Sequence, residues 1–276
     1  MPELPEVETI IRGLRRGVDG APTIIGQEIT GISLFWPKTL ATHDPETVNR
    51  LLNGQKVLAI SRRAKYILLE LDKTFLVVHL RMSGDLRMAP DLGAEQVLPH
   101  DRFYLHFASG WGLAFNDARK FGRVWISPDP ASILPKLGPD PLDPSLNAAS
   151  FHEMLTSRGR QLKPLLMDQS FLAGVGNIYS TEALYAARLH PLQNSRYISL
   201  KEAKKLLQAL RDVLEWGIAH NGTSIDWVYK GGDFQKYLKA YQHTGLPCER
   251  CGTPIEDLVS AQRRAHYCPR CQKLHE

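Results

Sequence analysis

The spacing of hydrophobic positions changes along the 276-residue chain and predicts where its helices and strands lie. Near the N-terminus, apolar side chains recur at helical spacing, at Val7, Ile10, Ile11 and Leu14. They predict a leading helix over residues 6–18. From Gly26 to about Ser127 the apolar runs are short, β-rich and separated by turn residues. This second pattern predicts an antiparallel β-sandwich behind the leading helix.

The stretch "SPDPASILPKLGPDPLDPSLN" ends the β-rich region and holds six prolines in 21 residues, too many for regular structure. Beyond it, helical periodicity predicts helices over 151–169, 177–189 and 199–220, the last capped by Ser199 with Glu202 as a capping box. The expected fold class is α+β and multi-domain. The expected divisions are a catalytic β-sandwich domain (1–130), a proline-rich linker (131–147), a helical domain (148–240) and a cysteine-bearing finger (241–276).

Composition sets limits on location and partners. No apolar stretch is long enough to span a membrane, and the acidic N-terminus lacks the apolar segment of a signal peptide, so we expect a cytosolic protein. The formal net charge is +5, a modest bias towards nucleic acid. Four thiolates around one Zn²⁺ would lower it to about +3. Any affinity for DNA must therefore come from a local basic surface.

All four cysteines lie in one C-x2-C-x16-C-x2-C segment, at Cys248, Cys251, Cys268 and Cys271. Paired C-x2-C knuckles at this separation are typical of a structural Zn(Cys)4 site in a small finger that has too little apolar surface to fold without metal. The alternative is a pair of disulfides or a redox C-x-x-C. A cytosolic location argues against both.

Seven motifs occur in a fixed order: "MPELPEVET", "RRAKY", "HLRMSGDLR", "ARKFG", "LKPLLMDQ", "GVGNIY" and "AQRRAHYCPRCQ". Together they resemble the bacterial formamidopyrimidine-DNA glycosylases (Fpg/MutM), which excise oxidised purines and then cut the DNA at the abasic site. The resemblance runs from end to end. It implies an N-terminal β-sandwich, a helix-two-turns-helix domain, one zinc ion in the finger, and damaged double-stranded DNA as the partner of a monomeric bacterial enzyme.

The resemblance makes Pro2 the nucleophile. Once Met1 is removed, Pro2 carries a free secondary amine, and α-amino groups have pKa values of about 7.7–8.0, so a neutral fraction exists at neutral pH. Such an amine can attack the sugar C1′, expel the base and form an iminium link to the DNA. Glu3, the next residue, could protonate the opening sugar ring, and the family assigns it that acid role.

Two cations complete the implied catalytic set. Lys65 is placed on a predicted strand, where a solvated lysine is the ordinary interpretation, but the motif assigns it to β-elimination and DNA contact. Arg263 matches the finger arginine linked to δ-elimination. Because an arginine is a poor proton donor, we expect it to orient phosphate and stabilise charge.

Three residues match the side chains that fill the gap when a base is turned out of the duplex. Met82 by default is a core methionine, but by resemblance it fills the space left by the lesion. Arg119 and Phe121 are two residues apart, so an extended backbone would point both the same way. By resemblance Phe121 wedges into the opposite strand and Arg119 bonds the unpaired cytosine. The alternative is an aromatic side chain packed beneath a basic turn.

Two further residues are implied to bind the DNA backbone. Asn177 follows two glycines and opens a predicted helix, an arrangement that binds phosphate through exposed N–H groups. His100 matches a histidine that touches the backbone. Arg160 and Lys163 are expected only to form a basic patch.

Three positions depart from the family pattern. Arg264 follows Arg263 where a small residue is usual, His243 stands in an arginine position, and the segment "TSIDWVYKGGDF", matching a loop that closes over the turned-out base, is short. Recognition of the base is therefore less well specified than the lyase chemistry. Two alternatives follow: an endonuclease VIII-like enzyme for oxidised pyrimidines, and a zinc-finger DNA-binding protein without catalytic activity.

Overall fold

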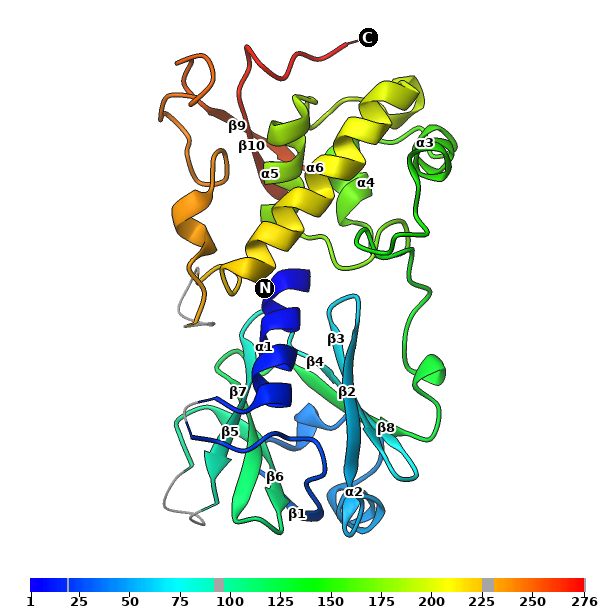
Figure 1. The fold of residues 1–276 in the computed structure, drawn as a ribbon, viewed down its shortest axis with the longest axis vertical. Helices are drawn as coiled ribbons and strands as arrows, with labels where there is room; N and C mark the ends of the chain where they lie inside the picture. Colours follow the sequence, from blue (N-terminus) through cyan, green and yellow to red (C-terminus); the bar gives the residue numbers. More distant parts are fainter. Residues whose placement is uncertain (19, 92–96, 225–230, 276) are drawn as a thin grey trace. The chain divides into compact units, whose positions relative to one another are not determined.

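The computed structural model describes residues 1–18, 20–91, 97–224 and 231–275. It divides the chain into two compact units. The first, unit 1, comprises Met1–Pro135 with Thr223–Gly232, and the second, unit 2, comprises Lys136–Gly222 with Asp233–Glu276. Figure 1 shows their elements in chain order from blue to red. Within the described residues, no helix combines the length and apolarity needed to cross a membrane. The predicted domain bounds remain predictions.

Unit 1 begins with helix α1 (Leu4–Arg16), which starts and ends two residues earlier than predicted. It starts early because Pro5 suits a first helical turn, with Glu3 as the residue before the helix. It ends at Gly17, whose φ of +77° and tight contact with the carbonyl of Ala21 leave no room for a side chain. Its apolar face packs into the core of unit 1.

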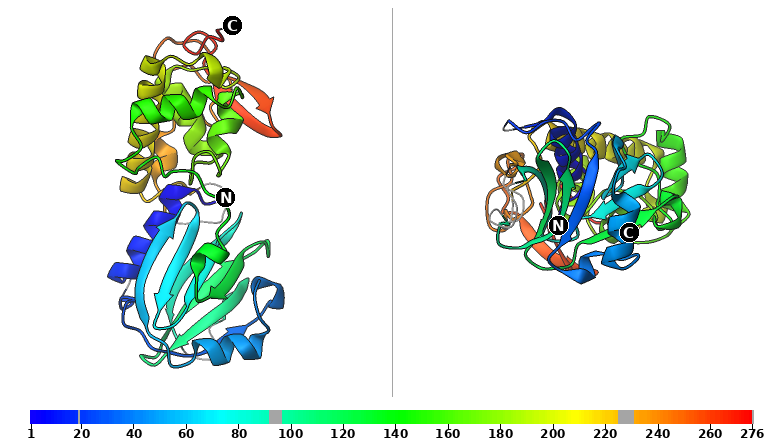
Figure 2. Two further views of the ribbon diagram at one scale, coloured as in Figure 1. Left: turned by 90° about the vertical axis from the view of Figure 1, so that its right-hand side faces the viewer. Right: turned by 90° about the horizontal axis from the view of Figure 1, so that it is seen from below.

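Two four-stranded antiparallel sheets follow. Figures 1 and 2 show these sheets beside α1. One has the order β2-β3-β4-β8, from β2 (Val57–Arg63), β3 (Tyr66–Leu71), β4 (Phe75–His79) and β8 (Arg123–Ser127). The other has the order β1-β6-β7-β5, from β1 (Ile29–Leu34), β6 (Asp101–Phe107), β7 (Trp111–Asp117) and β5 (Gly84–Pro90). Apolar side chains from both sheets and α1 form one core, which confirms the predicted sandwich.

Two details of unit 1 differ from the prediction. The apolar run 57–71 is a hairpin, because the chain turns at Ala64 (φ +54°) and Lys65 instead of continuing as one strand. Helix α2 (Pro45–Leu52) was not predicted. Its signal was local: the Asp44 side chain accepts a hydrogen bond from the N–H of Thr47, and a proline follows in the first turn.

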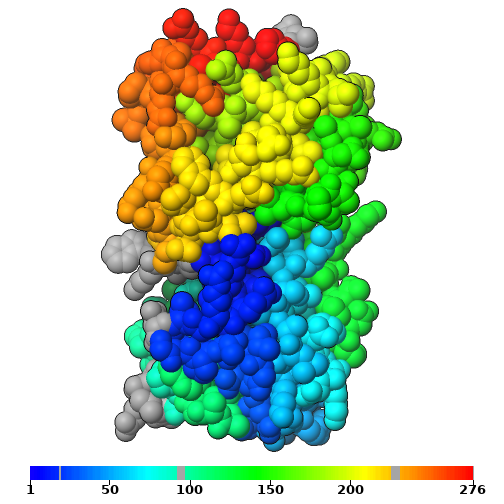
Figure 3. All heavy atoms as spheres, viewed as in Figure 1, coloured from blue at the N-terminus to red at the C-terminus, as the bar shows by residue number. Residues whose placement is uncertain are grey.

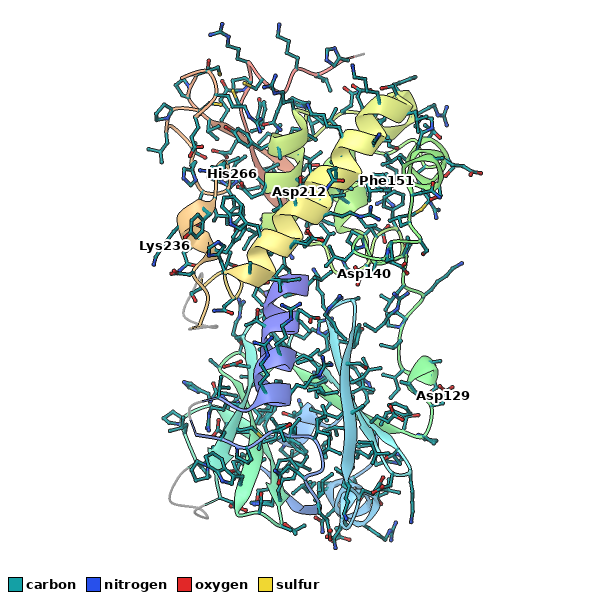
Figure 4. The ribbon with its side chains drawn as sticks, in the orientation of Figure 1. Asp129, Asp140, Phe151, Asp212, Lys236 and His266 are labelled. Carbon is teal, nitrogen blue, oxygen red and sulfur yellow. The ribbon has the colours of Figure 1, made fainter. Side chains whose placement is uncertain are left out.

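Unit 2 contains four α-helices among its described residues: α3 (Ala148–Thr156), α4 (Leu162–Met167), α5 (Asn177–Ala187) and α6 (Leu200–Ala219). Helix α6 begins with the predicted capping box of Ser199 and Glu202. Its apolar face packs on α5 and α3, while its other face lies at the surface (yellow in Figure 3). Phe151, labelled in Figure 4, is fully buried on α3. The predicted helix 151–169 is wrong as a single element, because Gly159 (φ +59°) lies in the break between α3 and α4.

The cysteine-bearing segment ends unit 2 in the two-stranded hairpin of β9 (Glu256–Ser260) and β10 (Arg263–Tyr267). Ala261 and Gln262 form its turn with φ values of +48° and +60°, the left-handed pair typical of a tight hairpin. Strand β10 contacts α5. This contact joins the hairpin to the helical part of unit 2, and Arg263 comes directly after the hairpin turn.

Candidate functional site

The N-terminus of unit 1 is held by a network of carboxylates. Pro2 is buried, and Glu3, directly before α1, is only 3% exposed. Glu6 Oε2 accepts a hydrogen bond from the backbone N–H of Glu3 at 2.8 Å. Glu6 Oε1 accepts two more, from the N–H and the hydroxyl of Thr223, at 2.8 and 3.0 Å. The buried Glu6 thus fixes the backbone that carries Pro2 and Glu3.

Lys65 lies in the β2–β3 turn, not on a strand as predicted, and is only 4% exposed. His79, at the end of β4, is buried nearby. Burial, together with the positive charges of Arg81 and Lys65, lowers the pKa of His79 to about 3. Its neutral ring accepts a hydrogen bond from the N–H of Arg81 at 3.1 Å. Lys65, His79 and Arg81 therefore form one cationic cluster around an uncharged imidazole.

Met82 lies half-buried in the turn between β4 and β5, outside the apolar core. The next residue, Ser83, donates its hydroxyl to Asp117 Oδ1 and accepts the N–H of Arg119 at 3.0 Å. Asp117 also accepts the N–H of Gly122 through Oδ2 at 2.7 Å. This clamp holds the Met82 turn against the loop that carries Arg119 and Phe121.

Arg119 and Phe121 lie together, although not for the predicted reason. Their segment is a turn with Lys120 at φ +61°, not extended backbone. The Arg119 guanidinium lies 5.3 Å from the centre of the Phe121 ring, and Phe121 is 48% exposed. An aromatic ring packed beneath the turn is therefore excluded. Exposed His100 belongs to the same region, because its carbonyl accepts the N–H of Asp117 at 2.9 Å.

The clamp makes a testable prediction for Asp117→Asn. An amide in place of the carboxylate turns one acceptor into a donor that faces a backbone N–H, and an unpaired buried group costs about 1–3 kcal/mol. We expect a lower melting temperature and weaker binding to duplexes with an abasic-site analogue, measured by calorimetry and anisotropy. Asp129→Asn, at a surface cap, is the control. Unchanged stability and binding in the Asp117 variant would exclude the clamp.

In unit 2, Asn177 is the first residue of α5, and Gly174 (φ +91°) shapes the loop before it. Its side-chain Oδ1 is buried without a hydrogen-bond partner among the described residues. Its backbone carbonyl accepts a hydrogen bond from Lys163 Nζ at 2.7 Å. Lys163 is 0% exposed, so the expectation of a surface patch that includes it is wrong: it supports the start of α5 from inside.

Arg263 and Arg264 are distinguished by their partners. Arg264 Nε lies 3.4 Å from Asp257 Oδ2 on the paired strand β9. Arg263 is exposed and has no ion pair within the described part of the chain. Because neighbouring strand residues point to opposite faces, only one of the two can face a given ligand. The ion pair of Arg264 leaves Arg263 as the available cation.

The four cysteines form a compact cluster in which all Sγ atoms lie within 4.8 Å of one another. The Sγ of Cys251 lies 3.5 Å from that of Cys268 and 3.4 Å from that of Cys271. Tetrahedral zinc with Zn–S bonds of about 2.3 Å requires sulfurs about 3.8 Å apart, so this set fits one structural zinc. The Tyr185 hydroxyl lies 3.2 Å from Cys248 Sγ and links the cluster to α5.

The structure describes two of the departures from the family pattern only in part. Residues 225–230 of the segment matched to the closing loop lie outside the described residues, and Thr223 before them is bound by Glu6. His243, in the family's arginine position, has its Nδ1 2.8 Å from the carbonyl of Tyr241.

Models of known protein families match three successive parts of the chain. A model of the formamidopyrimidine-DNA glycosylase N-terminal domain matches residues 1–124, and a model of that enzyme's H2TH domain matches 137–228. A model of the zinc finger found in FPG and IleRS matches 245–274. The chain belongs to the formamidopyrimidine-DNA glycosylase family. The resemblance drawn from the seven motifs is therefore confirmed.

Individual members of the family match over the full length. The formamidopyrimidine-DNA glycosylase of Protochlamydia amoebophila is 42% identical over 99% of this chain and 100% of its own. Lactococcus lactis Fpg in complex with DNA containing N7-benzyl-Fapy-dG superposes with a TM-score of 0.89 at 35% identity, covering 99% and 100% of the two chains. The same Lactococcus enzyme with an oxidised-pyrimidine DNA gives 0.89 at 34%, covering 99% and 100%.

Sequence reasoning missed the residues that support the site. Glu6, His79 and Arg81 lie inside quoted motifs, and Asp117 directly precedes "ARKFG". Their signal was a charged or titratable residue type within, or close to the end of, an element with an apolar face; such a residue is uncommon in a core unless it is bonded. Their partners are distant in sequence, so only the fold reveals them.

Proposed function

We propose that the protein is a bifunctional base-excision-repair enzyme that removes oxidised purines from double-stranded DNA and then cuts the strand by β,δ-elimination. One observation carries this proposal most directly: Pro2 is buried next to Glu3, and the backbone N–H of Glu3 is held by the buried Glu6 carboxylate. The full-length match to the glycosylase family supports the same conclusion.

The chemistry begins at the amine of Pro2 after Met1 is removed. The neutral amine attacks C1′, the base departs, and an iminium links the enzyme to the sugar. Glu3 supplies the proton for ring opening. Its side chain is buried directly before α1, next to Pro2 in sequence, where an acid can act on the sugar bound to that residue.

The two cations act on the phosphates and on elimination. Lys65, in its cluster with Arg81, assists the β-elimination step and binds the DNA backbone. Arg263, at the hairpin turn, orients phosphate during δ-elimination and offsets developing negative charge. Zinc holds the hairpin that carries Arg263 and takes no part in bond making, because four thiolates leave no open coordination position.

The remaining residues hold the DNA. Met82 fills the gap left by the lesion, while Phe121 enters the opposite strand and Arg119 hydrogen-bonds the unpaired cytosine. The exposed Phe121 ring and the clamp beneath it suit a wedge that must keep its shape. His100 and Asn177 bind the backbone, Asn177 through the start of α5.

Arg263 and Arg264 provide a matched pair of variants. We expect Arg263→Ala to lower the rate of δ-elimination about tenfold or more, since it removes a charge from the phosphate, while Arg264→Ala removes only a surface ion pair. Denaturing gels that separate β- from δ-products measure the difference. Equal effects of the two variants would contradict the assignment of Arg263.

The substrate class is tested by comparing single-turnover excision from duplexes with 8-oxoguanine opposite cytosine and with thymine glycol opposite adenine. We expect the purine lesion to be removed faster. The related Lactococcus complex with an oxidised pyrimidine makes the second duplex the relevant competitor. Faster removal of thymine glycol would favour the endonuclease VIII-like alternative, and removal of neither lesion would favour a DNA-binding protein without catalysis.

We further propose that the protein is a monomer and that it acts on the chromosome in the bacterial cytoplasm. Light scattering is expected to give the 31.1 kDa of one chain. A stable mass of twice this value would contradict the monomer.

A further inference from the structure

A second group of reactive side chains lies on the β1-β6-β7-β5 sheet of unit 1. Ser33 Oγ is 2.8 Å from His106 Nε2, and His106 Nδ1 is 2.6 Å from Asp91 Oδ2. This is the order and spacing of a serine nucleophile, its imidazole base and the carboxylate that orients the base. None of the three belongs to the DNA-processing residues described above.

The register of the sheet explains why these residues meet. Strands β1 and β6 are neighbours (Figure 1), and Ser33 pairs with Tyr104 while His106 pairs with Gly31. Ser33 and His106 are therefore diagonal neighbours. On β6, His106 alternates with Leu105 and Phe107, whose side chains lie in the core, so His106 lies on the outer face. Ser33 pairs with Tyr104, which is on the same face of β6 as His106, so Ser33 and His106 share the outer face.

A surrounding shell fixes the base and its carboxylate. The Tyr104 ring lies 4.9 Å from the His106 ring, and the Tyr104 hydroxyl donates to the carbonyls of Ala89 and Pro90 at 3.0 and 3.2 Å. The N–H of Asp91 donates to Gly110 at 2.8 Å. The side chains of His106 and Asp91 are 25% and 22% exposed, so the pair is shielded but reachable. These contacts leave the imidazole few alternative orientations.

The edge of the sheet supplies a donor for a developing oxyanion. β1 is the edge strand, and the N–H of Ile32 points away from β6 to Asn49 Oδ1 at 3.1 Å. The N–H of Leu34, two residues on, points the same way by strand geometry. It belongs to the residue directly after the serine, the position whose N–H serves as an oxyanion donor in many serine hydrolases.

We propose that Ser33, His106 and Asp91 form a second catalytic site, in which Ser33 accepts acyl or phosphonyl groups from small activated esters. Substrate size follows from exposure: the side chains of His106 and Asp91 are only about a quarter exposed, so a small electrophile fits the site better than a bulky one. The proposal is independent of the DNA repair function.

The reaction is balanced without a further reagent. His106 Nε2 takes the proton of Ser33 as Oγ bonds to the carbonyl carbon of the ester. The tetrahedral intermediate then expels its alkoxide or phenoxide, which leaves with the proton held by His106. Water, deprotonated by His106, cleaves the acyl group from Ser33 as a carboxylic acid and restores the serine.

The test is labelling of the full-length protein with a biotin-linked alkyl fluorophosphonate, followed by intact mass and peptide mapping. We expect one adduct on Ser33, with fluoride released. Ser33→Ala should abolish it, and His106→Gln should slow it by about 10²-fold or more, although glutamine can still hydrogen-bond Ser33. Ser61→Ala, at an exposed serine of β2, is the matched control and should label like the unaltered protein.

Melting curves and DNA cleavage are measured on every variant to establish that it is folded, and both are expected to be unchanged in Ser33→Ala. The proposal is overturned if the unaltered protein fails to label under conditions that label a known serine esterase. It is also overturned if the adduct lies elsewhere, or if His106→Gln labels at the original rate, which would identify the three residues as a purely structural network.

Discussion

Leaving one residue in front of Pro2 is expected to lower base excision and strand cleavage by at least about 10³-fold. A preceding residue converts the secondary amine into a tertiary amide, whose nitrogen lone pair is delocalised into the planar peptide bond and is no longer nucleophilic. The measurement is single-turnover cleavage of an 8-oxoguanine duplex by the processed and extended forms.

The matched control is binding of both forms to a duplex with an abasic-site analogue. Because the other DNA contacts are unaltered, we expect binding to change by less than the activity does. A tag-derived residue must therefore be removed before any activity is assigned. Full activity in a form whose mass shows the extra residue would mean that the terminal amine is not the nucleophile.

Removal of zinc is expected to lower DNA cleavage by about 10²-fold or more. Adding zinc back is expected to restore cleavage. Metal binding supplies about 10–16 kcal/mol to small zinc fingers, and the apolar cluster around the cysteines contains no residue of the β9–β10 hairpin that carries Arg263. The finger is tied to the helical part of unit 2: Gln272 accepts the N–H of Cys268 at 2.8 Å and donates to Leu189 at 2.8 Å. Loss of the metal releases both Arg263 and this anchor.

Cys271→Ser tests the same point without a chelator, with native mass spectrometry for zinc and gels for cleavage. Tyr185→Phe is the control, since it removes the hydroxyl near Cys248 and leaves all four ligands. We expect the control to keep its zinc. If zinc-free protein cut DNA at the original rate, the finger would not position a residue needed for the reaction.

The fold was largely predictable because its signals are local. Short β-rich runs separated by turn residues predicted the sandwich strands, and the capping box of Ser199 and Glu202 predicted the start of α6. The errors arose where backbone conformation breaks a uniform pattern. Ala64 and Gly159 turn the chain inside runs that read as single elements, and both have positive φ. A residue such as Ala64 gives no sequence signal for that conformation.

The candidate site was predictable in its motifs but not in its supports. The spacing of the four cysteines between Cys248 and Cys271 was enough to predict a zinc site, and their cluster in the structure fits one zinc ion. Glu6 binding Thr223, or Asp117 binding the loop at Gly122, depends on pairing across the fold that no local pattern encodes. The same holds for Ser33 and His106, which are 73 residues apart in sequence.

The proposed mechanism requires that the amine of Pro2 becomes covalently bound to DNA during the reaction. The most direct test is intact mass and peptide mapping of the processed protein after borohydride treatment in the presence of 8-oxoguanine DNA. We expect one protein–DNA adduct, reduced and irreversible, mapped to Pro2. Cleaved DNA without any adduct, or an adduct mapped to Lys65, would contradict it.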